Sequence, residues 1–230
     1  MLVVSNIDLT SSFPVMKPAK FLASKLKDFT LNLSCDYRYM KTGYYVSLHA
    51  EILGNQVIPT SENIIDSSRI PILLLRARRA GIPTLPFLVT DSVRKIVNEI
   101  GFSVIVYAVN PFIHDGYKTA RNKTALYRAV KSFGMNHKFA VCAQPLKGQM
   151  HTFKSFFGKC LESKEAQEIA EQVYRLFKIP VCQLHVQTIN GKEYLSGLQT
   201  VEKTELTPGD VRRISQEVLL QSEQGDQISG

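Results

Sequence analysis

The 230-residue sequence lacks the short motifs that mark several large enzyme classes. It has no G-x-x-x-x-G-K-[ST] loop, no G-x-G-x-x-G turn, no H-E-x-x-H helix and no G-x-S-x-G elbow. These absences argue against P-loop nucleotide hydrolysis, Rossmann-type dinucleotide binding, zinc proteolysis and serine hydrolysis. No carboxylate cluster of the kind that holds Mg²⁺ against phosphates is visible, and no nucleophile can be paired with a base.

Long apolar runs and paired cysteines are also missing. No run approaches the roughly 20 apolar residues that a membrane-spanning helix needs, and the first residues lack the basic segment of a secretory signal. The four cysteines, Cys35, Cys142, Cys160 and Cys182, form no C-x-x-C pair. Zinc sites and disulfide frameworks are therefore disfavoured. We expect a cytoplasmic protein that makes no membrane contact and carries free thiols.

Positive charge is concentrated in the middle of the chain. Residues 76–159 hold 14 Lys and Arg against 3 Asp and Glu, a net charge of +11. Residues 1–75 carry a net charge of +1, and residues 160–230 carry −4. A field of this sign favours anions such as phosphate, polycarboxylate or nucleic acid. A solvated cationic face without a specific partner explains the same pattern equally well.

The hydrophobic patterns predict an α/β or α+β fold. Strands over 2–7, 30–35 and 56–59 alternate with helices over 17–29 and from about Tyr45 to Leu53, which predicts an N-terminal wound β-α-β-α-β unit. The middle predicts a mixed sheet with helices. The end predicts a helix–β-hairpin–helix, because a helix over Ser163–Phe177 precedes two strands joined by Asn190-Gly191, and Thr207 can start a last helix.

This pattern predicts one domain over residues 1–220. Its expected sub-units are about 1–60, 61–150 and 151–220, and residues 221–230 read as a polar tail. In wound α/β units ligands collect at the carboxyl ends of strands, which places the segment after Cys35 where a site is expected.

That segment, residues 36–51, is dense in polar and aromatic side chains, and we call it the tyrosine-rich segment. Arg38 and Lys41 could pair with a carboxylate or phosphate near a helix N-terminus. Helical spacing puts two sets of side chains on opposite faces of the following helix. The first set is Tyr44, Ser47 and Glu51, and the expected core-directed set is Tyr45, Leu48 and Ile52. Half-buried packing is the alternative interpretation of the tyrosines.

A second candidate lies at residues 110–121, after the best buried strand. It supplies His114, Asp115, Lys118 and Arg121. The His114-Asp115 pair invites an acid–base interpretation, but neighbours in sequence rarely align as a base and its orienting group. A turn with Asp-Gly at its apex explains the pair as well.

Two stretches resemble a known family. Tyr37-Arg-Tyr-Met-Lys-Thr-Gly-Tyr-Tyr-Val-Ser-Leu-His-Ala-Glu51, continued by Gly54-Asn-Gln-Val-Ile-Pro59, resembles the signature of the RimK-like ATP-grasp N-terminal domain, and Phe156-Phe-Gly158 with the helix and hairpin after it is a second match. Together they span about residues 1–220. The positions that match the family pattern are Tyr39, Gly43, Tyr44, Tyr45, Ser47, Glu51 and Pro59.

The resemblance implies a domain that normally precedes an ATP-grasp amide ligase. No ATP-grasp domain is expected in this chain, so ATP and Mg²⁺ are implied only for a fused or separate ligase partner, and no cofactor, metal ligand or catalytic residue is expected here. The leading prediction is a non-catalytic substrate-recognition or regulatory domain that binds an acidic small molecule, an acidic peptide or the ligase. The expected ligand-binding residues are Arg38, Tyr39, Lys41, Gly43, Tyr44, Ser47, Glu51, Lys118 and Arg121.

Two other functions remain open at this stage. The net charge of the middle third fits a nucleic-acid- or ribosome-associated binding module, although no aromatic stacking motif or GXXG clamp supports it. A small-molecule enzyme centred on His114 and Asp115 is the third interpretation.

Overall fold

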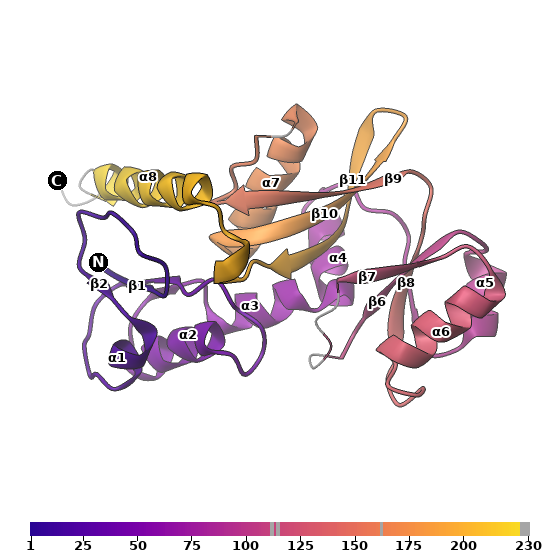
Figure 1. The fold of residues 1–230 in the computed structure, drawn as a ribbon, viewed down its shortest axis with the longest axis horizontal. Helices are drawn as coiled ribbons and strands as arrows, with labels where there is room; N and C mark the ends of the chain where they lie inside the picture. Colours follow the sequence, from indigo (N-terminus) through magenta and orange to yellow (C-terminus); the bar gives the residue numbers. More distant parts are fainter. Residues whose placement is uncertain (111–112, 114–115, 162, 226–230) are drawn as a thin grey trace.

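The computed structural model describes the whole chain except residues 111–112, 114–115, 162 and 226–230. Within the described part, helices and short connections surround three separate sheets (Figure 1). One sheet is parallel and two are antiparallel, so the predicted mixed α/β class is confirmed.

The first sheet is the N-terminal wound unit. Its strands are β1 (Leu2–Ser5), β2 (Val15–Met16), β3 (Thr30–Leu33) and β4 (Val57–Ile58), all parallel in the order β2-β1-β3-β4. The connecting helices are α1 (Pro18–Leu22) and α2 (Thr42–Ile52). Helix α1 is much shorter than the predicted 17–29. It ends because the N–H and the hydroxyl of Ser24 both donate to the Phe21 carbonyl, at 2.9 and 2.8 Å, which turns the chain away.

The second sheet is antiparallel and has the order β5-β8-β6-β7. Its strands are β5 (Leu88–Thr90), β6 (Val104–Ala108), β7 (Tyr117–Ala120) and β8 (Val141–Pro145), and helices α5 (Val93–Glu99) and α6 (Lys123–Phe133) pack against it. Ser92 and Asn122 cap these two helices, each accepting the backbone N–H three residues on. The buried strand expected just before residue 110 is confirmed as β6, whose first four residues are buried.

The third sheet has the order β11-β10-β9. Its strands are β9 (Gln149–Phe156), β10 (Val181–Ile189) and β11 (Lys192–Thr200). Asn190 and Gly191 join the last two with φ of 50° and 76°, the left-handed conformation that a two-residue hairpin requires. The predicted helix over 163–177 is confirmed as α7 (Lys164–Phe177), which Ser163 caps.

Three more helices and a short turn complete the described fold. Helix α3 (Ser61–Ser68) precedes α4 (Ile70–Arg79). Together with α7 these helices contact the third sheet, β11-β10-β9, which we call the hairpin sheet. After β11, a short turn η1 (Lys203–Glu205) leads into α8 (Pro208–Gly225), so residues 221–225 are helical, and 226–230 of the expected polar tail lie outside the described residues.

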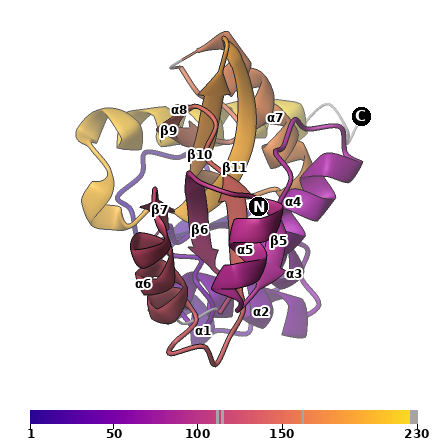
Figure 2. The same ribbon diagram turned by 90° about the vertical axis from the view of Figure 1, so that its right-hand side faces the viewer.

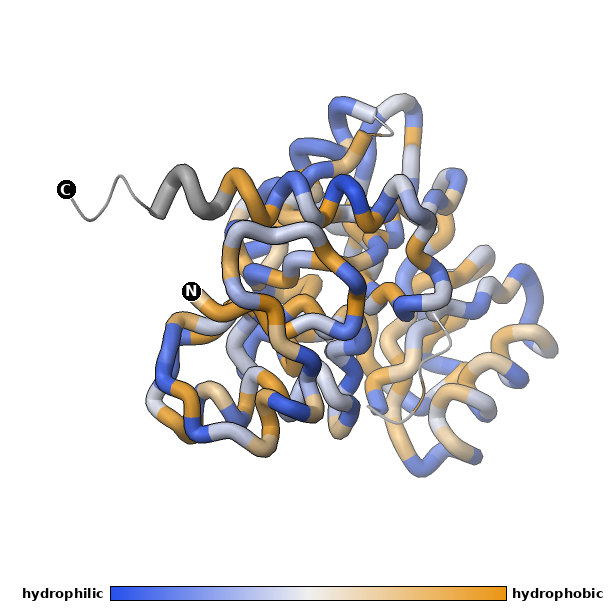
Figure 3. Tube along the Cα trace, turned by 60° about the vertical axis from the view of Figure 1, so that its left-hand side comes forward, coloured by the Kyte–Doolittle hydropathy of each residue, from blue (hydrophilic) through white to orange (hydrophobic). Residues whose placement is uncertain are grey.

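The hydrophobic core joins these units. Buried side chains of α4, α7, β10, β11 and β6 form one cluster, and a second links β1 and β3 to α8 and the start of β10. Figure 2 shows the hairpin strands standing above the second sheet, and Figure 3 shows hydrophobic stretches in the interior with hydrophilic residues on the outer turns. Among the described helices, none combines the length and the apolar character of a membrane span.

Candidate ligand-binding cleft

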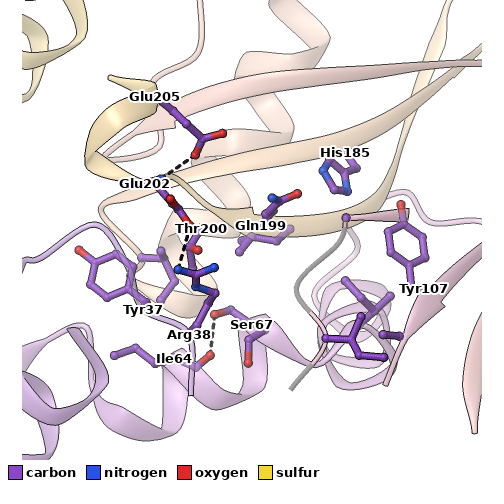
Figure 4. Close-up of a pocket in the computed structure, with 17 residues that line it drawn as sticks. Tyr37, Arg38, Ile64, Ser67, Tyr107, His185, Gln199, Thr200, Glu202 and Glu205 are labelled. Atoms are coloured by element: carbon purple, nitrogen blue, oxygen red, sulfur yellow. Dashed lines mark hydrogen bonds and ion pairs between the residues drawn. The ribbon is translucent and has the colours of Figure 1, made fainter. Parts of the chain in front are cut away.

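A cleft of about 380 Å³ lies where the hairpin sheet meets the N-terminal unit and strand β6 (Figure 4). We call it the intersheet cleft. Its lining comes from the loop after β3, from α3, from β6, from β10 and β11, and from the turn that follows β11. The residues used below are Arg38, Tyr107, His185, Gln199, Glu202 and Glu205. A volume of this size is within the range of small-molecule sites.

Strand pairing builds one wall of the cleft. His185 of β10 stands opposite Gly197 of β11, and Gln199 follows two residues later, on the same side of that strand. We call these three residues the cleft face. Gly197 is needed for close approach, because a Cβ there would lie 3.0 Å from the Tyr107 ring.

His185 is the least satisfied polar group of the cleft face. It is 3% exposed, and its Nδ1 atom has no hydrogen-bond partner. Burial lowers the pKa of His185 from 6.5 to about 4, although a hydrogen bond with Gln199 opposes the shift. The imidazole is therefore neutral at pH 7 and can accept a hydrogen bond from a ligand.

Aromatic rings hold the imidazole in place. Tyr107 stacks on His185 with ring centroids 6.0 Å apart and planes 19° apart, and Tyr117 meets the same ring edge-on at 5.1 Å. The Tyr107 hydroxyl donates to Ser196 Oγ at 3.0 Å. Ser196 donates in turn to Gln144 Oε1 at 2.9 Å, and Gln144 Nε2 donates back to the Ser196 carbonyl at 2.9 Å. This buried network ties β6, β8 and β11 together, and burial raises the pKa of Tyr107, which stays protonated.

Charged groups gather at the other end of the cleft. Arg38 pairs with Asp36 through two donors and with Glu202 at 2.8 Å. Burial alone would raise the pKa of Asp36, but hydrogen bonds from Arg38 outweigh it and lower that pKa. Glu205 accepts the Glu202 backbone N–H at 2.7 Å, which fixes the turn after β11. Arg38 is the one cation among the described lining residues, against two glutamates.

The ligand-binding residues expected in the tyrosine-rich segment do not lie together at one site in the structure. Arg38 reaches the cleft, with 22% of its side chain exposed. Lys41 is exposed at the start of α2, and Tyr44 is half-buried, with its ring 5.2 Å from that of Tyr39. Neither Lys41 nor the two tyrosines line the cleft, so their binding role stays a prediction.

Three more of the expected residues make contacts inside the fold. Gly43 lies so close to the Asp36 carbonyl that no side chain fits there. Ser47 donates to the Pro59 carbonyl at 2.6 Å, and Glu51 accepts from the Ser61 N–H at 2.8 Å and from its hydroxyl. These bonds fasten α2 to the start of α3.

The predicted core-directed face of α2 is wrong. Tyr45 is 41% exposed and Ile52 is 74% exposed, while Val46, Ser47 and Ala50 are buried. The helix turns this other side inward because Asn32 of β3 donates to the Gly43 carbonyl and to Ser47 Oγ, at 2.7 and 2.9 Å.

The second candidate segment reaches the cleft through Gly116 and Tyr117, but its expected binding residues Lys118 and Arg121 do not line it. Lys118 donates to Ser132 Oγ at 2.7 Å and lies over the Phe133 ring, beside a shallow hollow between β7 and α6. Arg121 is exposed. His114 and Asp115 lie outside the described residues, so their acid–base interpretation is not tested.

Sequence reasoning missed the cleft face altogether. A signal was present, since His185 and Gln199 are polar residues within strands whose neighbours are apolar. Only the pairing of β10 with β11 and the approach of Tyr107 bring these groups together.

Comparisons with known proteins agree on one fold. The model of a family described as the RimK-like ATP-grasp N-terminal domain matches residues 19–217. No curated protein matches closely enough to count as a relative. Among solved structures, a RimK domain ATP-grasp protein from Sphaerobacter thermophilus is 12% identical, with a TM-score of 0.68, over 96% of this chain and 100% of that one.

Two solved ligases give similar values. The D-alanine–D-alanine ligase of Bacillus anthracis is 14% identical, with a TM-score of 0.68, over 100% of this chain and 99% of its own. The ATP-grasp ligase PsnB, solved with a precursor peptide and AMPPNP, is 14% identical, with a TM-score of 0.64, over 96% and 98%. The expectation of a non-catalytic recognition module, or of a basic nucleic-acid-binding module, is therefore wrong. Solved ATP-grasp proteins match between 96% and 100% of this chain, so the chain itself has the fold of these ligases.

Proposed function

Because this chain belongs to the family of RimK-like ATP-grasp N-terminal domains, we propose that it takes part in carboxylate–amine ligation and binds the amine in its intersheet cleft. Relatives of the same fold are ligases, among them D-alanine–D-alanine ligase and PsnB. The observation that carries the proposal is the buried His185 Nδ1, a ring nitrogen without a hydrogen-bond partner in the wall of the cleft.

The charges of the cleft favour an amine. Glu202 and Glu205 line it, and Arg38 is already paired with Asp36 and Glu202. The nearby lysines point elsewhere, since Lys154 pairs with Asp210 at 2.8 Å and Lys203 lies 3.6 Å from Asp8. Carboxylates therefore exceed free cations at this end, and an ammonium group is favoured over a carboxylate.

The cleft face supplies hydrogen bonding at the other end. A neutral imidazole accepts an N–H or O–H, and the Gln199 amide can accept or donate beside it. A pKa of about 4 makes His185 a weak base, so its contribution is to orient a ligand and not to remove a proton at pH 7.

Metal and nucleotide need a separate test of fit. One structure of the B. anthracis ligase contains ATP, and one of PsnB contains Mg and ADP. In the present chain the cleft offers an imidazole and an amide at one end and the carboxylates of Glu202 and Glu205 at the other, and the described residues contain no group of three His, Cys, Asp or Glu side chains that could hold a metal. Magnesium in proteins takes one or two carboxylates together with phosphate oxygens, so Glu202 and Glu205 are the lining residues that would hold it.

Calorimetric titration of the full chain with primary amines of increasing length tests the proposal. Glycinamide, putrescine and L-lysinamide are suitable probes, and acetate and succinate are the acidic comparison. We expect at least one amine to bind, and Glu205→Gln to weaken it several-fold. Glu168→Gln, on the exposed side of α7, is the matched control and leaves the affinity unchanged. Binding of the acids and of no amine overturns the proposal.

We also propose that the chain acts in the cytoplasm. The support is that all four cysteines are unpaired thiols and buried, as in proteins of a reducing compartment. The expected partners, which are a fused or separate ligase, an acidic molecule or peptide, and nucleic acid, stay predictions. An acidic partner fits the exposed basic side chains of Arg121 and Arg128 better than it fits the cleft.

A further inference from the structure

We propose that the open edge of β7 and the adjoining side of α6 form a docking surface for an acidic peptide in an extended conformation. We call this surface the basic edge. Unbalanced positive charge, an unpaired strand edge and a hollow between strand and helix support it. The hollow shares no lining residue with the intersheet cleft, so this surface is independent of the function proposed above.

The segment that forms the basic edge carries charge of one sign. Residues 116–140, which contain β7 and α6, hold six Lys and Arg and no Asp or Glu. None of these six cations forms an ion pair with the part of the chain that the structure describes. Lys118 is half-buried, and the exposed cations are Arg121, Lys123, Arg128, Lys131 and Lys138. Positive charge that no carboxylate neutralises attracts an anionic partner.

Strand β7 leaves one of its edges unpaired. In the described structure it pairs with β6 and with no other strand, so one row of its backbone N–H and C=O groups lacks a strand partner. Figure 2 shows β7 at the margin of its sheet, beside α6. Such a row can accept an added strand, because an extended peptide repeats the same donors and acceptors along its backbone. A phosphodiester backbone has no N–H donors, so the strand edge favours a peptide over a nucleic acid.

A hollow of about 320 Å³ brings the strand edge and the charge together. Its lining comes from Lys118 and Thr119 of β7 and from Ala125, Arg128 and Ala129 of α6. Lys118 and Thr119 are successive residues of a strand, so their side chains point to opposite faces of the sheet. A space that both residues line is consistent with an opening at the strand edge. The small alanine side chains leave room there for the backbone of a peptide.

Neutral groups hold the Lys118 ammonium in place. It donates to Ser132 Oγ at 2.7 Å and lies 4.6 Å from the centroid of the Phe133 ring. A hydroxyl and an aromatic ring orient the ammonium without cancelling its charge. A carboxylate of an incoming peptide therefore meets a cation whose position is already fixed, which lowers the entropy cost of the ion pair.

A second copy of this chain suits the basic edge less well. Pairing of β7 with β7 of another copy would bring Lys118 and Arg128 of both chains together, and like charges that face each other across paired strands are destabilising. An acidic peptide satisfies the charge and the backbone groups at once.

The test uses the full chain and three fluorescein-labelled heptapeptides, followed by fluorescence anisotropy. The first peptide alternates Glu and Thr, the second has Lys in place of each Glu, and the third is the first with N-methyl groups on all backbone amides. We expect the first peptide to bind, with an affinity that falls as salt screens the charges. The other two should bind at least about tenfold more weakly. Equal binding of the first and third peptides would mean attraction without strand pairing and overturns the proposal.

Variants and hydrogen exchange locate the contact. Arg128→Gln should weaken binding of the first peptide about fivefold, since one charged contact is lost. Arg79→Gln, at an exposed position of α4, is the matched control and leaves the affinity unchanged. The peptide should also slow amide hydrogen exchange of residues 117–120.

Three results would contradict this assignment. They are an equal loss of affinity in both variants, unchanged exchange of residues 117–120, and tighter binding of a single-stranded DNA of equal charge than of the peptide. Sedimentation adds a fourth, a dimer of the chain that the peptide does not dissociate. Amine binding is titrated into the Arg128→Gln variant as well and should not change, so failure at the basic edge leaves the proposed function standing.

Discussion

The tyrosine-rich segment and the cleft face are both rich in polar side chains, yet they use them in opposite ways. In the first, Ser47 and Glu51 are bonded to Pro59 and Ser61, and Asn32 holds Gly43 and Ser47. In the second, His185 is equally enclosed and keeps a nitrogen without a partner. The comparison teaches that a dense polar sequence can be structural, while the polar group of interest at His185 is a buried nitrogen without a partner that lies beside a cleft.

The largest predicted effect is on stability and concerns the hydrogen bonds that hold the tyrosine-rich segment in place. Asn32→Ala removes two donated bonds and the bond accepted from the Ser34 N–H, and leaves the Gly43 carbonyl buried without its donor. We expect the free energy of unfolding to fall by about 3 kcal/mol, since these bonds form a buried network. Urea denaturation measures the change, and Asn98→Ala, at an exposed position of α5, is the control. A loss no larger than that of the control would put Asn32 among functional instead of structural residues.

The next effect is a pH dependence that only the cleft face should show. The unfolded chain binds a proton at His185 near pH 6.5, but the folded chain does not until about pH 4, because burial lowers this pKa. Stability is therefore retained above pH 6.5 and decreases as pH falls from 6.5 towards 4, by about 3 kcal/mol. The measurement is the difference in unfolding free energy between wild type and His185→Phe at several pH values. A constant difference would show that His185 titrates normally in the folded protein.

The variant His185→Phe also tests, at constant pH, whether a ligand contacts His185. The substitution keeps a ring against Tyr107 and removes the free acceptor. We expect the affinity for the bound amine to fall about tenfold, the value of one hydrogen bond. Thermal stability should be unchanged or higher, because an unpaired buried polar atom is removed. His151→Phe on β9 is the matched control, and equal effects of the two variants on amine affinity would rule out a ligand contact at His185.

The smallest effect is expected at Arg38, which belongs to the tyrosine-rich segment and lines the cleft at the end away from the cleft face. Arg38→Gln releases Asp36 and Glu202, so the cleft becomes more negative. We expect the amine to bind a few times more tightly, and stability to fall by only about 1 kcal/mol, since this ion pair is partly exposed to solvent. Calorimetry at low and at high salt checks the result, because screening should remove the gain. Weaker binding would identify Arg38 as a direct ligand contact.

Local patterns were enough to predict much of the fold. Asn190-Gly191 predicted the hairpin because few residues other than Asn and Gly adopt two successive positive φ angles, and helical spacing of apolar residues predicted the helix over Ser163–Phe177. The end of α1 could not be predicted in the same way. Apolar spacing continues to Phe29, and the decisive event is the bond from Ser24 to Phe21.

The cleft was less predictable because it depends on long-range geometry. The strands β10 and β11 slip in register between His185 and Val186, so simple alternation does not tell which residues share a side. Tyr107 meets Ser196 across 89 positions of sequence, and no periodicity reports such a contact. Of the nine residues expected to bind a ligand, Arg38 is the one that the structure brings to the cleft.

The hydrogen bonds from Tyr107 to Ser196 and from Ser196 to Gln144 join two sheets by directional contacts at one end of the cleft. These bonds oppose both sliding and hinge opening of the two sheets, because either motion would leave three buried polar groups without partners. The Arg38–Glu202 pair and the His185 imidazole lie at opposite ends of this cleft, so a ligand that contacts both must extend between them. The length of a ligand, as well as its charge, should therefore decide whether it binds.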